Sequence, residues 1–464
     1  MFDISDNQLN SLVREGMKSG GDWCDLYFER TCYHEMMMRD SVISSGGFHV
    51  DCGCGIRVLK GEKTGYAYSE NLDYKSLLKA ASAASAIADG PRTAVPELNV
   101  TEVNAPSFYR EERKWEEAET SAFIPWIKTL EERIKARDSR IEKVLISFAY
   151  STAEIMMYNS LGEKTLDCRP LGSISVSTVC RKGRRTENTH ASRSFRCGSE
   201  LLSPRIMDEL VEQSTDKLDD LFAAGRPKGG QMSVVMGAGA SGILLHEAMG
   251  HSFEADFNRK GQSIFADRMG QRICRKGIDI IDDGTIEANR GAGNFDDEGI
   301  PGQKTYMVRD GMLTSYLHDR ISAGFYGVAP TGNGRRECFR YNPIPRMRCT
   351  YMGGGNDGSV EDLIAEVSKG VYVDQFANGE VKIGEGDFTF YVKRGYLIEN
   401  GRLTAPIKDI NIIGNGPQAL SDIVGVADDL KIDNGTWTCG KGQSVAVSCG
   451  IPSVLVKNLT VGGE

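Results

Sequence analysis

The pattern of hydrophobic and polar positions changes near residue 225. Before it, helix-period stretches alternate with strand-like runs. The helical stretches are residues 73–88, 115–138 and 204–224, and the strand-like runs are 142–151 and 172–180. Ser203 is a predicted N-cap, Pro204 stands at the first helical position and Gly225 is a predicted stop. This alternation predicts a mixed α/β domain over residues 1–225.

The second half of the chain has short apolar or alternating runs separated by turn dipeptides. Such dipeptides between strand-like runs are strong hairpin signals, and they occur at Asp310-Gly311, Asn378-Gly379 and Asn400-Gly401. Short helical patterns interrupt the runs at residues 242–250 and 359–368. We therefore expect residues 226–464 to form a mostly antiparallel β domain that carries a short helix, and the whole chain to be an α+β protein.

Composition narrows the classes of function. The uneven distribution of glycine supports two domains of different architecture, since 15 of the 53 glycines lie in residues 1–225 and 38 in residues 226–464. A formal charge of −9 argues against a general nucleic-acid binder, and no apolar run is long enough to span a bilayer. The first residues, MFDISDNQLNSL, lack the pattern of a secretory signal, so we expect a cytoplasmic protein. The twelve scattered cysteines are then expected to be mostly reduced, buried thiols.

The candidate metal ligands and the candidate catalytic base lie in the run LLHEAMGHSFEADFN. The chain has only six histidines, and two of them, His246 and His251, stand here with Glu247 directly after the first. A zinc hydrolase typically has two imidazoles that hold the metal ion and an open position for a water. It also has a carboxylate that takes the water's proton. The segment therefore predicts a catalytic metal site, with Glu247 as general base.

The two histidines are five residues apart, one more than in the familiar H-E-x-x-H motif. On an unbroken α-helix, five steps of about 100° put the second ring about 140° round from the first, so both could not reach one ion. A π-type turn would bring them to one face, or the helix would end at Gly250 with His251 entering from the loop. Gly250 favours the second arrangement. A third ligand is left open by the residues alone, among Glu254, Asp256, His318 and a distant cysteine.

A family resemblance narrows that choice. Four segments resemble the TldD/PmbA family of metalloproteases: HEAMGHSFEADFNRKGQSIF, NPIPRMRCTYM, DFTFYVKRGYLIENGRL and the ending TCGKGQSVAVSCGIPSVLVKNLTVGG. Because the chain has the H-E-x-x-x-H motif, it resembles the catalytic TldD-like branch of that family. The resemblance implies that one Zn²⁺ is held by His246, His251 and Cys439, with Glu247 as base. Glu254 and Asp256 then become partners that orient a ligating imidazole.

The resemblance also implies how such a protein works. Family members form dimers, often of a catalytic subunit and a PmbA-like subunit that lacks the motif, around an internal cavity that admits unfolded peptides. We therefore expect a peptide substrate and a homodimer or a heterodimer with a PmbA-like homologue. No membrane or direct nucleic-acid partner is expected.

Other hypotheses remain at this stage. Residues 237–242 form a G-x-G-x-x-G that follows a strand-like run, as in dinucleotide-binding folds, although no βαβ pattern follows it. A thiol hydrolase would use Cys439 with His251 or His318. The chain could also be a regulatory or partner subunit, since the family is linked by name to modulation of DNA gyrase. The arginine-rich segment 334–348 is a candidate site for carboxylates of a peptide.

Overall fold

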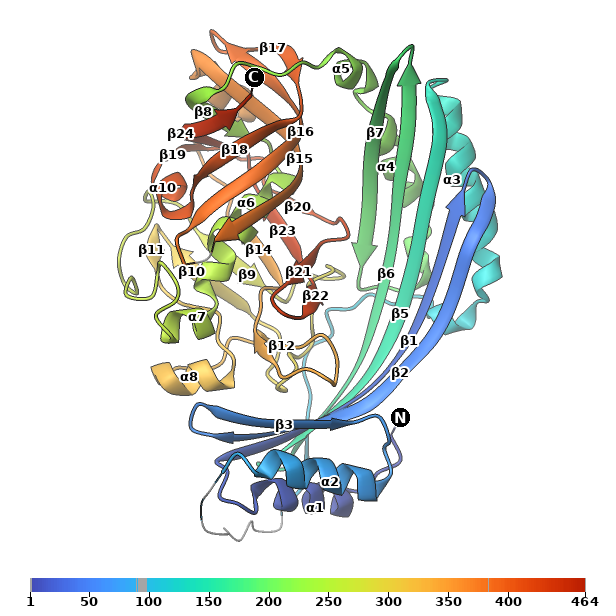
Figure 1. The fold of residues 1–464 in the computed structure, drawn as a ribbon, viewed down its shortest axis with the longest axis vertical. Coiled ribbons are helices and arrows are strands. Elements are labelled where there is room, and N and C mark those ends of the chain that lie inside the picture. The colour runs from blue at the N-terminus through green and yellow to red at the C-terminus, as the bar shows by residue number, and fades with distance from the viewer. Residues whose placement is uncertain (1, 89, 91–97, 383, 464) are drawn as a thin grey trace.

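The computed structural model describes residues 2–88, 90, 98–382 and 384–463. Its N-terminal half is built on one strongly twisted sheet with strand order β3-β2-β1-β5-β6-β7 and β4 added beside β6 (Figure 1). All neighbours in it are antiparallel except β4 and β6. The strands are β1 (Trp23–Arg39), β2 (Val42–Lys60), β3 (Lys63–Ser69), β4 (Thr101–Val103), β5 (Ile141–Asn159), β6 (Glu163–Lys182) and β7 (Arg185–Phe195).

Two pairs of helices cover this sheet at its two ends. The helices α1 and α2 pack beneath the lower end, and α3 and α4 cover the upper end on the side away from the C-terminal half (Figure 1). Ser5 caps α1 and Asp73 caps α2, each accepting a backbone N–H of the first turn. The helices are α1 (Asp6–Met17), α2 (Tyr74–Ser85), α3 (Ile124–Arg137), α4 (Pro204–Thr215) and α5 (Leu218–Ala223).

Two of the predicted helices differ in extent from the sequence pattern. The stretch from Trp115 begins as two short 3-10 turns, and its α-helix starts only at Ile124, next to Pro125. The stretch from residue 204 breaks into α4 and α5 because Lys217 adopts the left-handed region with φ 57°. The predicted N-cap Ser203 is found, and its hydroxyl accepts the N–H of Ile206 at 3.3 Å.

The C-terminal half contains a closed ring of five strands. In the order β15-β8-β24-β18-β16 each strand pairs with the next, and β16 pairs back to β15, with β17 and β19 attached outside the ring. Only β8 and β15 run parallel among these pairs. The strands are β8 (Gly230–Met236), β15 (Lys369–Lys382), β16 (Asp387–Glu399), β17 (Arg402–Ile407), β18 (Ile410–Asn415), β19 (Ile423–Val426) and β24 (Val454–Gly462).

A six-stranded sheet of order β11-β10-β9-β14-β23-β20 packs beside this ring and shares its core. Two short hairpins, β12–β13 and β21–β22, stand apart from both. The remaining strands are β9 (Ile280–Asp283), β10 (Lys304–Arg309), β11 (Met312–Leu313), β12 (Gly334–Arg335), β13 (Ile344–Pro345), β14 (Cys349–Met352), β20 (Lys431–Asp433), β21 (Thr438–Gly440), β22 (Ser444–Ala446) and β23 (Ser448–Ile451). The helices are α6 (Ile243–Leu245), α7 (Ala255–Arg259), α8 (Arg320–Tyr326), α9 (Val360–Ala365) and α10 (Gly416–Ser421).

The expected α+β class and the β-rich C-terminal half are both found. Asp310-Gly311 and Asn400-Gly401 are hairpin turns with positive φ at both residues, as their dipeptides require. The hairpin predicted at Asn378-Gly379 is wrong. These two residues lie inside β15, where they pair with Tyr391 and Phe390 of β16. The twelve cysteines are free, and nine of them are buried.

Candidate metal centre

Both motif histidines lie on one short helical segment that follows β8. A 3-10 turn (Ala240–Gly242) leads into α6, and a π-helical turn over His246–Gly250 carries the first histidine. The backbone N–H of His251 donates to the carbonyl of His246, five residues earlier. This bond closes the wider turn, which brings residues at a spacing of five towards one face.

The arrangement in which a helix ends at Gly250 is therefore wrong. Gly250 has helical dihedrals (φ −57°, ψ −47°), and His251 continues the helix at φ −61° and ψ −34°. Gly250 serves packing instead, because a Cβ there would lie 2.1 Å from the sulfur of Met347. Two more close approaches hold this segment: a Cβ at Gly242 would lie 2.6 Å from the backbone nitrogen of Gly450, and one at Gly416 would lie 2.3 Å from the carbonyl oxygen of Ala248.

These contacts also explain part of the glycine-rich run 237–242. A Cβ at Gly237 would lie 2.6 Å from the hydroxyl of Tyr372, and Gly239 has φ 91°. The run packs the metal-binding segment against β15 and β23. The described residues do not support the dinucleotide hypothesis. The parallel neighbour of β8 is β15, and the six strands β9 to β14 lie between the two in the chain instead of a single crossover helix.

Cys439 joins the two histidines from the hairpin β21–β22. Possible ligand atoms of His246, His251 and Cys439 all lie within 4.8 Å of one another, and all three residues are buried. Sγ of Cys439 is 3.3 Å from Nε2 of His251, and the two imidazole centroids are 5.2 Å apart with planes at 82°. Among the described residues this is the group of three such side chains placed to share an ion.

The electrostatics favour a thiolate at this position. Burial is the largest single effect on the thiol and raises its pKa, but the charge and hydrogen bonds of His246 and His251 together outweigh it and bring the pKa of Cys439 to about 4. The thiolate is the form of cysteine that binds metals and attacks carbonyls. The arrangement therefore suits either a metal ligand or a thiolate–imidazole pair.

Glu254 fixes the orientation of His251. Its Oε2 lies 3.0 Å from Nδ1 of His251, and the ammonium of Lys441 is also 3.0 Å away. Burial would raise the pKa of Glu254, but Lys441 and His251 lower it to about 2. The ionised carboxylate accepts a hydrogen bond from the Nδ1–H group, which leaves Nε2 to face Cys439. Asp256 does not touch either motif imidazole and instead pairs with Lys441 at 2.7 Å.

Glu247 stands at the more open side of the site. One carboxylate oxygen is 3.9 Å from Nε2 of His251, and its side chain is 22% exposed while that of Glu254 is fully buried. Of the other candidate third ligands, neither Glu254 nor Asp256 is in the group of three. His318 is also outside it: the ring is buried next to Tyr316 and Tyr326, and burial lowers its pKa to about 4.

Two residues that support the site were not singled out for this role from the sequence. Lys441 bridges Glu254 and Asp256, and the buried Arg346 donates to the carbonyl oxygens of Cys439 and Gln443 at 2.6 and 2.8 Å. Arg346 belongs to the segment 334–348, in which we expected partners for peptide carboxylates. It is used instead to hold the hairpin that presents Cys439.

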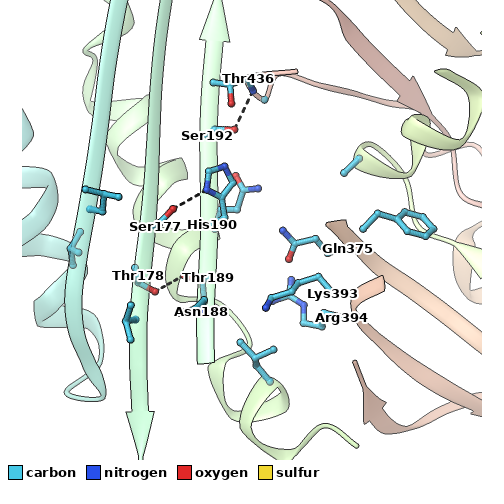
Figure 2. Close-up of a pocket in the computed structure, with 18 of the residues that line it drawn as sticks. Ser177, Thr178, Asn188, Thr189, His190, Ser192, Gln375, Lys393, Arg394 and Thr436 are labelled. Carbon is cyan, nitrogen blue, oxygen red and sulfur yellow. Dashed lines mark hydrogen bonds between the residues drawn. The ribbon is translucent and has the colours of Figure 1, made fainter. Parts of the chain in front are cut away.

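A cavity of about 800 Å³ lies between the N-terminal sheet and the ring of strands. Figure 2 shows side chains of β6 and β7, including Ser177, Asn188 and His190, facing Gln375, Lys393 and Arg394 across it. Trp437, two residues before Cys439, and Ala240, at the start of the metal-binding segment, also line the cavity. These two residues are close in sequence to the candidate ligands, although His246, Glu247, His251 and Cys439 do not themselves line the cavity.

Comparison with known proteins decides the family. Residues 229–463 match the PmbA/TldA metallopeptidase C-terminal domain, residues 24–88 match domain 1 and residues 113–222 match the central domain. The chain is 36% identical to the Metalloprotease TldD homolog of Haemophilus influenzae, over 95% of this chain and 93% of that protein. The chain belongs to the PmbA/TldD family of metallopeptidases. It is also 34% identical to the Metalloprotease TldD homolog of Buchnera aphidicola, over 99% and 96% of the two chains.

Solved structures share the fold of this PmbA/TldD chain. A proposed modulator of a DNA gyrase from Thermotoga maritima superposes with a TM-score of 0.79 at 20% identity, over 98% of each chain. TldE from Thermococcus kodakarensis gives 0.76 at 19% identity, over 98% of this chain and 100% of that one. Among the described residues of this PmbA/TldD chain, no helix is long and apolar enough to cross a membrane.

Proposed function

We propose that this metallopeptidase is a zinc enzyme in which His246, His251 and Cys439 hold one Zn²⁺ and Glu247 is the general base. The observation that carries the proposal is the convergence of two imidazoles and one thiol, all buried, with ligand atoms within 4.8 Å. Three protein ligands of nitrogen and sulfur with one open position are typical of catalytic zinc.

The donor set fits that ion. Zn–N bonds of about 2.0–2.1 Å and a Zn–S bond of about 2.3 Å imply an N···S separation of about 3.6 Å in a tetrahedral site. Nε2 of His251 and Sγ of Cys439 are 3.3 Å apart. Nδ1 of His246 is buried and has no hydrogen-bond partner among the described residues, as expected where an imidazole serves a metal site.

The chain's own groups then have definite tasks in peptide hydrolysis. A bound zinc ion supplies Lewis acidity towards the scissile carbonyl and acidifies a water. Glu247 takes the water's proton on its carboxylate and returns it to the leaving amine. Glu254 keeps the Nδ1 proton of His251 in place, so that Nε2 stays available as a donor atom. Arg346 and the backbone of β21 hold the thiolate of Cys439 in position.

The neighbouring cavity supports peptides as substrates. Its volume of about 800 Å³ accommodates a short extended segment but no folded domain, and hydroxyl, amide and cationic side chains line it. We propose that unfolded peptides or small protein segments lie along it on their way to Glu247. The cleavage site would then be the peptide bond that reaches the open side of the metal centre.

The test combines metal content, hydrolysis and two variants of the full chain. Purified protein is expected to carry about one zinc per chain and to lose peptide hydrolysis on chelation. Glu247→Ala should abolish turnover while zinc remains bound, and Cys439→Ser should lower the zinc content. A fully loaded and active Cys439→Ser protein would contradict the ligand set, and an active Glu247→Ala protein would contradict the base.

A second candidate activity comes from the same geometry. Sγ of Cys439 lies 3.3 Å from an imidazole nitrogen, a distance that also suits a thiolate nucleophile and its partner base in a cysteine hydrolase. Chelation separates the two, because the thiol enzyme would remain active without metal. Bound zinc with no turnover by the isolated chain would favour a role as a partner or regulatory subunit.

We further propose assembly with a second copy or a PmbA-like homologue. The β1–β2 hairpin exposes Val42, Phe48 and Val50, which are 64%, 62% and 43% accessible, and such a patch supports a protein interface. Mass measurement in solution, with and without a PmbA-like homologue, tests this.

We also propose that residues 1–225 and 226–464 are separate domains. The proposed location is the cytoplasm, in keeping with the twelve free cysteines.

A further inference from the structure

A smaller cavity of about 300 Å³, here called the arginine pocket, lies between the N-terminal sheet and the C-terminal half. Thr438 of β21 and Ala446 of β22 line it. Successive side chains of a strand point to opposite faces, so Thr438 faces this pocket while Cys439 faces the imidazoles. Six arginines line the pocket: Arg169, Arg196, Arg290, Arg335, Arg336 and Arg348.

Four of these arginines are in no ion pair with the described carboxylates: Arg196, Arg290, Arg335 and Arg348. Their N–H groups donate to neutral oxygens instead. Arg335 donates to the carbonyls of Met347 and Ala446 at 2.5 and 2.9 Å, and Arg290 donates to the carbonyl of Trp437 at 2.8 Å and to the hydroxyl of Ser194 at 2.6 Å. Neutral acceptors satisfy the hydrogen bonds but balance the positive charges less than a paired carboxylate does. The buried Asp282 and Asp296 attract Arg348, although neither is within ion-pair distance of it.

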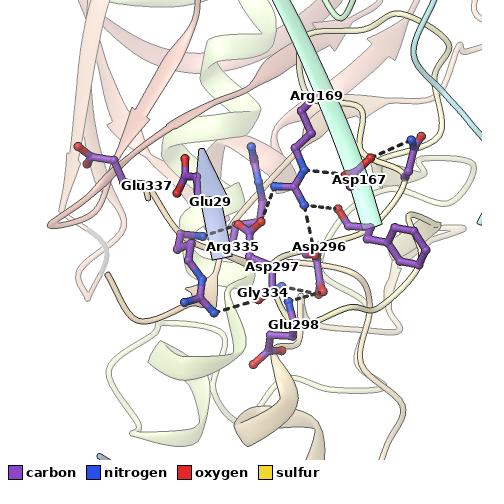
Figure 3. Close-up of polar contacts among 12 residues, drawn as sticks. Glu29, Asp167, Arg169, Asp296, Asp297, Glu298, Gly334, Arg335 and Glu337 are labelled. Carbon is purple, nitrogen blue, oxygen red and sulfur yellow. Dashed lines mark hydrogen bonds and ion pairs between the residues drawn. The ribbon is translucent and has the colours of Figure 1, made fainter. Parts of the chain in front are cut away.

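The carboxylates that line the pocket do not restore the balance. They are Glu29, Asp297 and Glu337. Figure 3 shows Asp297 engaged with Arg169, which also bonds Asp167. Burial raises the pKa of Glu29 to about 7, which weakens its negative charge, and Glu337 is exposed to solvent. The pocket therefore carries excess positive charge, although the chain as a whole has a net charge of −9.

Keeping this charge buried costs free energy. Arg290, Arg335 and Arg348 are each more than 90% buried. Burial lowers the pKa of Arg290 to about 10, with the charge of Arg196 adding to the effect, and it also lowers the pKa of Arg335, with Arg348 adding. Buried charges are normally paired, since an unpaired one carries its full desolvation penalty. A bound anion would offset that cost.

We propose that the arginine pocket is a binding site for the oxyanion of a small ligand, a carboxylate or a phosphate. Guanidinium groups match the planar, two-oxygen geometry of these anions and bind them with paired hydrogen bonds. A volume of about 300 Å³ admits the terminal residue of a peptide or a free phosphate and excludes a nucleic-acid duplex. The site is independent of the proposed peptidase chemistry, because it requires neither a metal ion nor hydrolysis.

Calorimetric titration of the full-length protein tests the proposal with three probes. These are inorganic phosphate, N-acetylalanine, which has a free carboxylate, and N-acetylalanine amide, which does not. At least one of the two anions should bind with one site per chain, and the amide should not. Phosphate binding alone identifies a phosphate site, whereas binding of N-acetylalanine in preference to phosphate identifies a site for a peptide terminus.

Variants then locate the binding. Arg335→Gln and Arg290→Gln should each weaken binding of the anion at least tenfold, while the exposed Arg205→Gln should leave it unchanged. Circular dichroism and the melting temperature establish that each variant is folded. A wild-type protein that binds neither anion, or binding that survives both pocket variants, would overturn the proposal.

A measurement on the wild-type protein covers the case in which the variants do not fold. Crystals soaked in selenate should show anomalous density beside Arg290 and Arg335, and the density should disappear when phosphate or N-acetylalanine is present in excess. The proposal would be contradicted if the anomalous density showed selenate at other positions of the crystal but none in the arginine pocket.

Discussion

Glu254 and His251 form the contact that orients the candidate metal centre. The carboxylate lies 3.0 Å from Nδ1 of the imidazole, is completely buried, and is kept ionised by Lys441 and by His251 itself. Glu254 thus orients His251 from a position only three residues away. The third candidate ligand, Cys439, comes instead from β21, 188 residues after His251 in the chain.

Replacing Glu254 with Gln should weaken zinc binding about 10- to 100-fold, because the imidazole loses the charged acceptor that fixes its tautomer and plane. Competition against a chromogenic chelator measures this without relying on activity. The matched control is Asp256→Asn, since Asp256 shares the Lys441 contact but does not touch His251. Equal losses in the two variants would assign the effect to Lys441.

Gly242 sets how closely the metal-binding segment approaches β23. A Cβ at this position would lie 2.6 to 2.9 Å from backbone atoms of Gly450, which cannot move aside as a flexible side chain would. Gly242→Ala should cost about 1–3 kcal/mol of stability by overpacking and should also weaken zinc binding. Chemical unfolding and the chelator assay measure the two effects.

The control for this prediction is Gly324→Ala. Gly324 lies in α8, is exposed, and would place its Cβ in open space. Alanine there is expected to stabilise the helix by up to about 1 kcal/mol. If Gly242→Ala behaved in the same way, close backbone packing would not be what positions the histidines.

The sequence predicted features that depend on local residue patterns. The α+β class, two of the three hairpin turns and the N-cap at Ser203 follow from periodicity and turn chemistry. The hairpin prediction failed at Asn378-Gly379, where pairing between the long strands β15 and β16 outweighs the local turn preference. The split between α4 and α5 at Lys217 was missed because a left-handed lysine leaves no mark in the hydrophobic pattern.

The sequence likewise predicted the part of the candidate site that lies in one local motif. The two histidines and Glu247 stand in one segment. Its π turn was the less favoured of two predicted arrangements, because Gly250 was interpreted as a helix stop and not as a packing contact with Met347. No spacing rule links Cys439 to that segment, so it was proposed from family resemblance alone. Lys441 and Arg346 meet the site only through tertiary contacts, which periodicity does not report.

Glu29 should make stability depend on pH. Burial raises its pKa from 4.5 to about 7 in the folded protein, so the native state keeps a proton that the unfolded chain releases near pH 4.5. Its contribution to stability is therefore greatest below pH 4.5, falls as the pH rises to about 7, and is then constant. The fall is on the order of 3 kcal/mol.

Glu29→Gln removes the titrating group and should flatten this part of the profile. Urea unfolding at pH 5 and pH 8 measures it: the variant should lose less stability between the two values than the wild type. Glu112→Gln is the control, since Glu112 is exposed and paired with the exposed Arg110. Parallel profiles for Glu29→Gln and the wild type would show that the carboxyl is ionised throughout.

Arg57 joins the two halves of the chain through a buried ion pair. From β2 it contacts Glu298 of the C-terminal half at 2.6 Å, and both side chains are completely buried; a second contact, also 2.6 Å, reaches Asp25. Arg57→Met should cost about 3–5 kcal/mol, because Glu298 and Asp25 remain buried without their cation. Arg110→Met is the control: this arginine is exposed, so its replacement should change the stability much less than that of Arg57.

The double variant Arg57→Met/Glu298→Gln separates lost attraction from stranded charge. If the cost of the single variant comes mainly from the unpaired carboxylate, neutralising Glu298 should recover a large part of it, and unfolding should show a coupling of more than about 1 kcal/mol between the two sites. Additive losses would mean instead that Arg57 stabilises the contact between the halves through packing. In that case the ion pair would add nothing to the packing that holds the N-terminal sheet against the loop carrying Glu298.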